Sequence, residues 1–335
     1  MKRFPLVVIT AALFLGLLMV VSVGVGPVTI PLGTVAEQAF ATSGSDTDPQ
    51  AIIIRELRIP RILLVVLVGA TLGMAGTVFQ GLFRNPLADP FVIGASGGAA
   101  LGAVVAIVLD LGRAGGGSLT WLAFAGALSA VAVVYALGGF GRHASSVTLI
   151  LAGAAVSTVF GAAVSFLMLL DEQSLQVIFT WLMGVFAGRG WPQLASSWPL
   201  MAFGIGWMML CARPLDALTL GEDAAAGLGL PLARARILIV VGASLATAAA
   251  VSVAGIIGFV GLIAPHAARL LVGAAHRRVL IASALLGAML LLVADNLART
   301  FLAPVEVPVG ILTAFLGGPF FLLLLRRHHQ RVGFG

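Results

Sequence analysis

The chain alternates between long apolar segments and short polar connections, and this pattern predicts its fold class. An α-helix needs about 20 apolar residues to cross a hydrocarbon core of about 30 Å. Ten segments approach that length: residues 4–24, 61–81, 92–110, 119–139, 147–169, 195–212, 237–255, 257–273, 279–296 and 307–325. They lack the alternation of polar and apolar residues that marks transmembrane β-strands. We therefore predict an all-α, polytopic transmembrane bundle of about ten spans, forming one domain over residues 1–335.

Two apolar segments fit this scheme less simply. Residues 176–188 are too few for a further span, so we expect either a short helix or an extension of the fifth span. Gly258 and Gly261 interrupt the segment 257–273, and Gly255 lies just before it. Glycine weakens a helix interior, and a break in the helix is the expected consequence.

Composition and charge place the chain in a membrane and orient it. Only 10% of the residues are charged, whereas soluble domains carry about 25%. Ten spans put both termini on one side, and Lys and Arg gather on the cytoplasmic side. With both termini inside, 13 of the 19 basic residues are cytoplasmic, so we predict N-in, C-in. Residues 25–60 then form a periplasmic loop, and residues 213–236 form the longest cytoplasmic loop, with short helices.

The residue types that support catalysis are scarce. Lys2 is the one lysine, so the chain lacks the Gly-rich turn with Lys and Ser/Thr that holds nucleotide phosphates. Cys211 is the one cysteine, and the predicted spans contain no nucleophile–base pair and no metal-ligand motif. We expect no enzyme activity, no catalytic residue, no cofactor and no metal site. Any ATP hydrolysis would come from another chain.

The predicted spans are almost uncharged inside, which bears on what the chain carries. Ion-coupled transporters usually place ionisable groups or broken helices near the centre of the membrane. An apolar path that coordinates its cargo only weakly instead suits a large substrate whose own chelator shields it. The energy for moving such a substrate would come from outside the chain. An ion-coupled secondary transporter is the alternative.

The cytoplasmic loop 213–236 contains a pattern typical of a short exposed helix. Glu222 and Asp223 suit a helix N-terminus, and Gly229 suits a helix end. The small residues 224–226 would let such a helix lie in a groove on another protein. An ordinary cytoplasmic turn would show the same spacing.

Seven motifs along the chain stand in an order that resembles a known family. They are Arg58-Ile-Pro-Arg61, Gln80-Gly-Leu-Phe-Arg-Asn-Pro-Leu-Ala-Asp-Pro90, Trp181-Leu-Met-Gly184, Leu220–Gly229, Gly258-Phe-Val-Gly-Leu-Ile-Ala-Pro-His-Ala-Ala-Arg269, Ala294-Asp295 with Arg299, and Val307-Pro-Val-Gly310. Over about residues 50–325 the chain is similar to permease subunits of type II ATP-binding-cassette (ABC) importers for iron complexes (ferric siderophores and haem) and cobalamin, the FecCD-type permeases.

The resemblance implies an assembly in the inner (cytoplasmic) membrane of a cell. Its core is a permease homodimer, although a heterodimer with a paralogous permease stays open. Two ABC ATPase subunits bind on the cytoplasmic side, and a periplasmic or lipid-anchored binding protein docks outside. The bilayer is the remaining partner, and no nucleic acid is involved.

The resemblance also implies roles for particular residues. Arg58, Arg61 and Arg299 match arginines that dock the binding protein. The ATPase coupling segment matches Leu220, Gly221, Glu222, Asp223, Ala224, Ala225, Ala226, Gly227, Leu228 and Gly229. The cytoplasmic gate matches Asn85, Leu87, Ser146 and Val147.

The sequence leaves the transported chelate open. An iron(III)-siderophore or related iron complex is the expected substrate of a permease with these motifs, with cobalamin (vitamin B12) and haem as alternatives. These permeases share the same motifs because the binding protein does most of the selecting.

Overall fold

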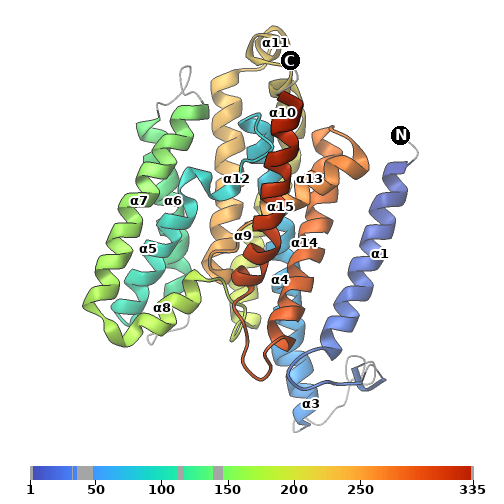
Figure 1. The fold of residues 1–335 in the computed structure, drawn as a ribbon, viewed down its shortest axis with the longest axis vertical. Helices are drawn as coiled ribbons and strands as arrows, with labels where there is room; N and C mark the ends of the chain where they lie inside the picture. Colours follow the sequence, from blue (N-terminus) through green and yellow to red (C-terminus); the bar gives the residue numbers. More distant parts are fainter. Residues whose placement is uncertain (1–2, 32, 36–47, 112–116, 139–145, 333–335) are drawn as a thin grey trace.

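The computed structural model describes residues 3–31, 33–35, 48–111, 117–138 and 146–332, and over these ranges the chain forms helices and no β-strand (Figure 1). The helices are α1 (Arg3–Gly24), α3 (Pro49–Ile52), the π-helical turn η1 (Ile53–Arg58), α4 (Ile59–Leu82), the 3₁₀ turn η2 (Pro90–Ile93), α5 (Ala95–Val108), α6 (Ser118–Leu137), α7 (Ser146–Leu170), the 3₁₀ turn η4 (Glu172–Ser174), α8 (Leu175–Leu182), α9 (Trp191–Leu210), α10 (Ala212–Thr219), α11 (Glu222–Gly227), α12 (Leu232–Ala254), α13 (Val260–Val272), α14 (His276–Thr300) and α15 (Val309–Val332).

The described helices agree with the predicted membrane spans. Six are long and apolar enough to cross a membrane, or seven if α9 and α10, bent by 46°, form one span. Three shorter apolar helices, α5, α13 and Val309–Leu323 of α15, account for the other predicted segments. The prediction of an all-α, polytopic transmembrane bundle is therefore confirmed.

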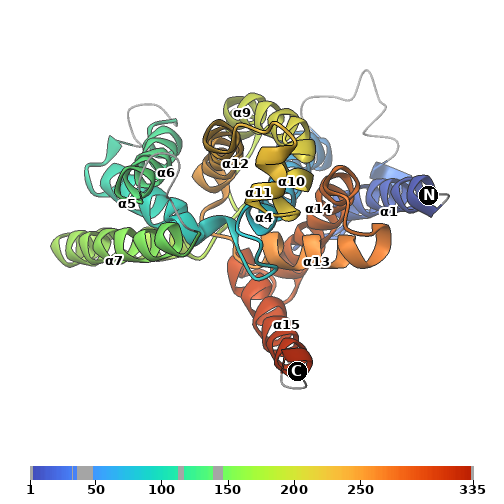
Figure 2. The same cartoon turned by 90° about the horizontal axis from the view of Figure 1, so that it is seen from above.

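Two helices form the centre of the bundle. In the most apolar 18-residue stretch of the helix, 78% is buried inside the bundle for α4 and for α12, against 11% for α1 and 22% for α7. Helix α4 packs against α14, α13, α12 and α9, while α5, α6 and α7 form a group on one side (Figure 2). Helix α1 lies against α14 on the other side of the bundle. The peripheral helices thus leave most of their apolar surface for lipid or for another protein.

Small residues let the central helices approach closely. A Cβ atom added at Gly73 of α4 would lie 2.3 Å from the carbonyl oxygen of Ser283 on α14. One added at Gly98 of α5 would lie 2.1 Å from the carbonyl oxygen of Gly126 on α6. Such contacts are the usual way for helices to pack tightly in lipid. Gly184 has another role, since its positive φ of 73° forms the turn after α8.

The short segments also have definite structures. The apolar stretch 176–188 contains the short helix α8, which η4 separates from α7, so it does not extend the fifth span. The predicted break near Gly255 is present, because α12 ends at Ala254 and α13 begins at Val260. The 213–236 loop contains α10 and α11, as expected. The 25–60 loop contains α3 and η1, and its residues 36–47 lie outside the described residues.

The bundle has two distinct ends. The start of α1, the end of α15 and helix α11 lie toward one end, and α3 lies at the other (Figure 1). We call these the inner end and the outer end, following the predicted orientation. That orientation itself stays a prediction.

Candidate functional site

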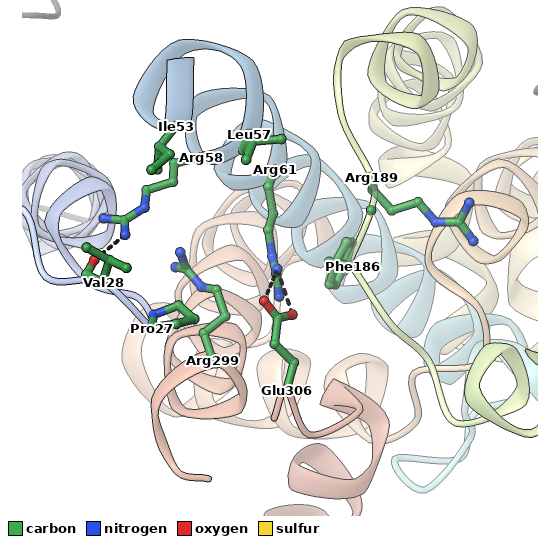
Figure 3. A pocket seen from close by; sticks show the side chains of 11 residues that line it. Pro27, Val28, Ile53, Leu57, Arg58, Arg61, Phe186, Arg189, Arg299 and Glu306 are labelled. Atoms are coloured by element: carbon green, nitrogen blue, oxygen red, sulfur yellow. Dashed lines mark hydrogen bonds and ion pairs between the residues drawn. The ribbon is translucent and has the colours of Figure 1, made fainter. Parts of the chain in front are cut away.

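A cavity of about 290 Å³ lies at the outer end, where α4 begins and α14 ends (Figure 3). Its lining residues are Pro27, Val28, Ile53, Leu57, Arg58, Arg61, Phe186, Gly188, Arg189, Arg299 and Glu306. Four of these eleven are arginines, so we name it the outer arginine cavity. A cavity with this charge suits contact with an acidic partner.

Arg61 is held by two carboxylates from the C-terminal part of the chain. Its Nε and Nη2 donate hydrogen bonds to Asp295 Oδ1 over 3.1 and 2.8 Å. Its Nη1 donates to Glu306 Oε1 and Oε2 over 3.0 and 2.8 Å. Asp295 is fully buried, and a buried charge is tolerated only when it is paired. Arg61 therefore neutralises Asp295 and at the same time ties α4 to α14 and to the loop that follows α14.

Arg58 and Arg299 both donate hydrogen bonds to backbone carbonyls at or just after the end of α1, and Arg299 also donates to the side chain of Asn296. Arg58 Nη1 donates to Val23 over 2.6 Å, and its Nη2 donates to Val28. Arg299 Nη1 donates to Val25 over 3.0 Å, and its Nε lies 3.1 Å from Asp295 Oδ2. Arginine has five donors in a planar fork, which lets it satisfy several carbonyls at once. The two side chains thus fasten the end of α1 and the residues that follow it to η1 and α14.

The structure brings together the three arginines expected to dock a binding protein. Arg58, Arg61 and Arg299 all line the outer arginine cavity. They are 6%, 8% and 3% exposed, respectively. A carboxylate arriving from outside would therefore have to compete with acceptors of the chain itself, and Glu306 is one of these.

Sequence reasoning missed two features of this cavity. No sequence pattern connects Glu306 with Arg61, 245 residues earlier in the chain, yet the two side chains form an ion pair. Sequence reasoning also gave no role to Arg189, which lines the cavity with its guanidinium pointing away from the other arginines (Figure 3). Burial lowers the pKa of Arg189. No local pattern reveals such pairings, because they depend on how distant segments pack.

The expected coupling segment forms an exposed helix at the inner end. Helix α11 begins with Glu222 and Asp223, and Gly229 follows it with a positive φ of 80°. Leu220 and Leu228 at its two ends are each 69% exposed, while Ala225 is fully buried. Of the residues of α11, Ala225 alone is buried against the bundle, and the leucines that flank the helix on either side are exposed.

The expected gate residues lie on two elements. Asn85 and Leu87 lie in the connection 83–89 between α4 and η2, where Leu87 N donates to Asn85 Oδ1 over 2.9 Å. Ser146 and Val147 begin α7, and Val147 is 64% exposed. The residues just before them, 139–145, lie outside the described residues.

Asp89 closes the connection 83–89 and has an unusual setting. Its side chain accepts a hydrogen bond from Phe91 N over 2.9 Å and another from Phe259 N. Part of the residue stays accessible, but the surrounding protein raises the pKa of its carboxyl to about 6, because desolvation outweighs these two bonds.

A second, apolar cavity of about 580 Å³ lies beside α15. It is lined by Leu182, Met183, Ile256, Gly258, Phe259, Gly310, Ile311, Ala314, Phe315 and Pro319. None of these side chains carries a charge. We name it the apolar groove. It borders the non-helical stretch between α12 and α13, and it suits apolar contacts with a bulky group.

The chain matches the model of the FecCD transport family over residues 13–327. It is 45% identical over 281 residues to the cobalamin import system permease protein BtuC of Halobacterium salinarum, covering 84% of this chain and 75% of that one. It is 43% identical over 290 residues to the hemin transport system permease protein HmuU of Yersinia pestis, covering 83% and 84%.

A solved structure shares the whole fold. It shows a metal-chelate type ABC transporter in an inward-facing conformation, with a TM-score of 0.83 and 33% sequence identity. The match covers 96% of this chain and 99% of that chain. Sequence and structure thus agree over nearly the full length, and the chain belongs to the FecCD transport family.

Proposed function

We propose that this chain is the membrane-spanning permease subunit of an ABC importer that moves a metal chelate across the inner (cytoplasmic) membrane. The observation that carries the proposal is the placement of two surfaces at opposite ends of one bundle. The outer arginine cavity suits an acidic binding protein, and the exposed helix α11 suits an ATPase groove. A chain with both surfaces can receive a substrate from a binding protein at one end and the energy of ATP hydrolysis from an ATPase at the other.

The partners follow from the same two surfaces. A substrate-binding protein docks outside through Arg58, Arg61 and Arg299, and two ATPase subunits bind residues 220–229 inside. Asn85, Leu87, Ser146 and Val147 form the cytoplasmic gate. A second copy of the permease covers the apolar groove and the exposed face of α15, where Phe315 is 75% exposed.

The proposed substrate is an iron(III)-siderophore or a related iron complex. A relative with 37% identity over 327 residues is an Fe(3+)-citrate import system permease of Bacillus subtilis. The uncharged apolar groove suits a chelate that shields its own metal. Cobalamin and haem are the alternative substrates, supported by the relatives with 45% and 43% identity.

An uptake experiment tests both the mechanism and the substrate. The chain is reconstituted in liposomes with its ATPase and binding protein, and accumulation of a labelled ferric siderophore, haemin and cobalamin is compared. We expect ATP-dependent uptake of the iron siderophore and none with a non-hydrolysable ATP analogue. Preferred uptake of haemin or cobalamin would show that this compound, and not an iron siderophore, is the substrate. Uptake driven by an ion gradient without ATP would instead support a secondary transporter.

A further inference from the structure

Glu222, the first residue of α11, forms ion pairs with two other elements of the inner end. Its Oε1 lies 3.2 Å from Arg84 Nη2 and 2.5 Å from Arg236 Nη2. Arg236 belongs to α12, and Arg84 belongs to the connection 83–89 after α4. The helix expected to contact the ATPase is thereby joined by one side chain to the connection that contains Asn85 and Leu87.

The backbone around Arg84 is tightly constrained. Arg84 has a φ of 49°, a left-handed conformation that few residues other than glycine adopt. Its N donates to Gly81 O over 3.3 Å, and Asn85 N donates to Gln80 O over 3.1 Å, which ends α4. Ala88 N then donates to Asn85 O over 3.1 Å. Because these bonds and Pro86 restrict the connection, a force on Arg84 acts on Asn85 and Leu87 as well.

The other end of this connection is fastened to the broken helix. Asp89 accepts the backbone N–H of Phe259, which precedes α13 with a φ of 68°. Phe259 in turn packs on α15, because a Cβ atom at Gly317 would lie 2.1 Å from Phe259 Cγ. Phe259 also lines the apolar groove. The connection 83–89 therefore runs from the ion pair with α11 to the wall of the groove.

We propose that Glu222 and Arg84 form a positioning link through which movement of the ATPase-contacting helix α11 is passed to the gate connection 83–89. The link rests on the proposed function, since it requires an ATPase at α11. Arg84 and Glu222 keep side-chain exposures of 44% and 45%. An ion pair that exposed contributes little to folding stability. A purely stabilising role for Glu222 at the helix N-terminus would not need Arg84 at all.

The gate connection itself supplies a readout that needs no transported substrate. Leu87→Cys is introduced with Cys211→Ser, which removes the one native thiol. The complex of permease and ATPase is reacted with a water-soluble maleimide, with and without ATP and vanadate. We expect ATP and vanadate to change the labelling rate of Cys at position 87 by about fivefold or more, the lower range of coupling between distant sites.

The link is then broken by Arg84→Gln, with Arg234→Gln as the matched control. Arg234 is an exposed arginine at the start of α12, so its substitution removes the same charge from the same end of the molecule. We expect Arg84→Gln to keep ATPase binding and basal ATP hydrolysis but to reduce the labelling response to less than about twofold. Arg234→Gln should keep the full response. Glu222 lies in the segment proposed to bind the ATPase, so Glu222→Gln is compared only in complexes that retain the ATPase. There its labelling response should fall as it does in Arg84→Gln, and the response of the double variant should be no lower than that of either single variant.

The contrary results separate the link from the function on which it rests. A full response in Arg84→Gln, or additive losses in the double variant, would overturn the link alone. The same holds if the unsubstituted complex hydrolyses ATP without any change in labelling. A permease that neither binds the ATPase nor stimulates it would overturn the proposed function, and the link with it.

Discussion

At the scale of single residues, Arg61 and Arg299 of the outer arginine cavity are already paired with carboxylates of the chain before any partner arrives. Arg61 and Arg299 both lie against the fully buried Asp295. Reversing either arginine to Glu would put like charges together inside the bundle, where an uncompensated charge costs about 3–5 kcal/mol. Loss of uptake in such variants would therefore report misfolding as readily as lost docking. Glu306 offers a cleaner test, because its side chain is 25% exposed.

Glu306→Gln should strengthen docking of the binding protein. The substitution removes one of the two carboxylates bound to Arg61 and leaves Asp295 paired, so Arg61 becomes more available to an acidic partner. We expect an increase in affinity of about tenfold or less, measured by binding of the purified binding protein to the permease in nanodiscs. Glu172→Gln, which removes an exposed carboxylate beyond α7, is the control. Weaker docking in Glu306→Gln would contradict an inhibitory role for Glu306.

Asp89 should make stability depend on pH in an unusual direction. A carboxyl whose pKa rises from 3.8 to about 6 on folding binds a proton more tightly in the folded state. Its contribution is therefore fully favourable below about pH 4 and is lost as the pH rises through 6. The loss is at most about 3 kcal/mol, and partial exposure of Asp89 lowers it.

The variant Asp89→Asn isolates this effect. Thermal unfolding of both proteins is followed from pH 4 to pH 7, so that the titration of all other groups cancels in the difference. We expect the unsubstituted protein to lose more stability than Asp89→Asn between pH 4 and pH 6.5. Parallel curves would show that Asp89 does not titrate in this range.

At the scale of elements, close helix contacts rather than long side chains hold the centre of the bundle. Gly76 of α4 faces Gly261 of α13, and a Cβ atom at position 76 would lie 1.8 Å from the carbonyl oxygen of Gly261. The same oxygen accepts a hydrogen bond from Gln80 over 3.2 Å. This crossing therefore fixes α4 against the helix that begins at the break near Gly255.

Gly76→Ala should destabilise the protein, because the new methyl group must push two backbones apart. Overpacking of this kind costs about 1–3 kcal/mol. Gly16→Ala in α1 is the matched control, since nothing lies within 4 Å of a Cβ atom there. Thermal unfolding in one detergent should show a lower midpoint for Gly76→Ala alone. Equal midpoints for the two variants would mean that the α4–α13 contact relaxes easily.

At the scale of the whole molecule, the fold leaves one side open. Helix α15 extends away from the bundle, and α7 borders the same open corner (Figure 2). Phe315 is 75% exposed there, and Leu151 and Val159 of α7 are each 65% exposed. The apolar groove lies beside α15, so this side suits a second copy of the chain.

We expect native mass spectrometry to find the permease at twice the 34.2 kDa of one chain. Phe315→Ala should weaken the pair by about tenfold, because packing rather than the hydrophobic effect joins helices in lipid. Phe14→Ala on α1, which removes a side chain that is 54% exposed on the other side, should not. A permease that stays monomeric at every concentration, or that pairs only with a different permease, would refute the homodimer.

The positions of most helices follow from the order of residues along the chain. Hydropathy and glycine breaks are local properties, so the ten apolar segments, the short helices α10 and α11, and the break after α12 could be placed from residue order. The short helix α8 was one of two alternatives that the sequence left open, and the structure decided between them. The seven ordered motifs likewise indicated the family, which the family match over residues 13–327 shows. These features need no knowledge of which segments meet.

Which charges and small residues face each other depends on how the helices pack in three dimensions. Arg61 and Asp295 lie 234 residues apart, and Arg84 and Glu222 lie 138 apart. No periodicity relates such positions, because helices in lipid choose neighbours by close packing of small residues, and many faces of an apolar helix look alike in sequence. The arginines expected at the surface are buried for the same reason: packing brought acceptors of the chain to them.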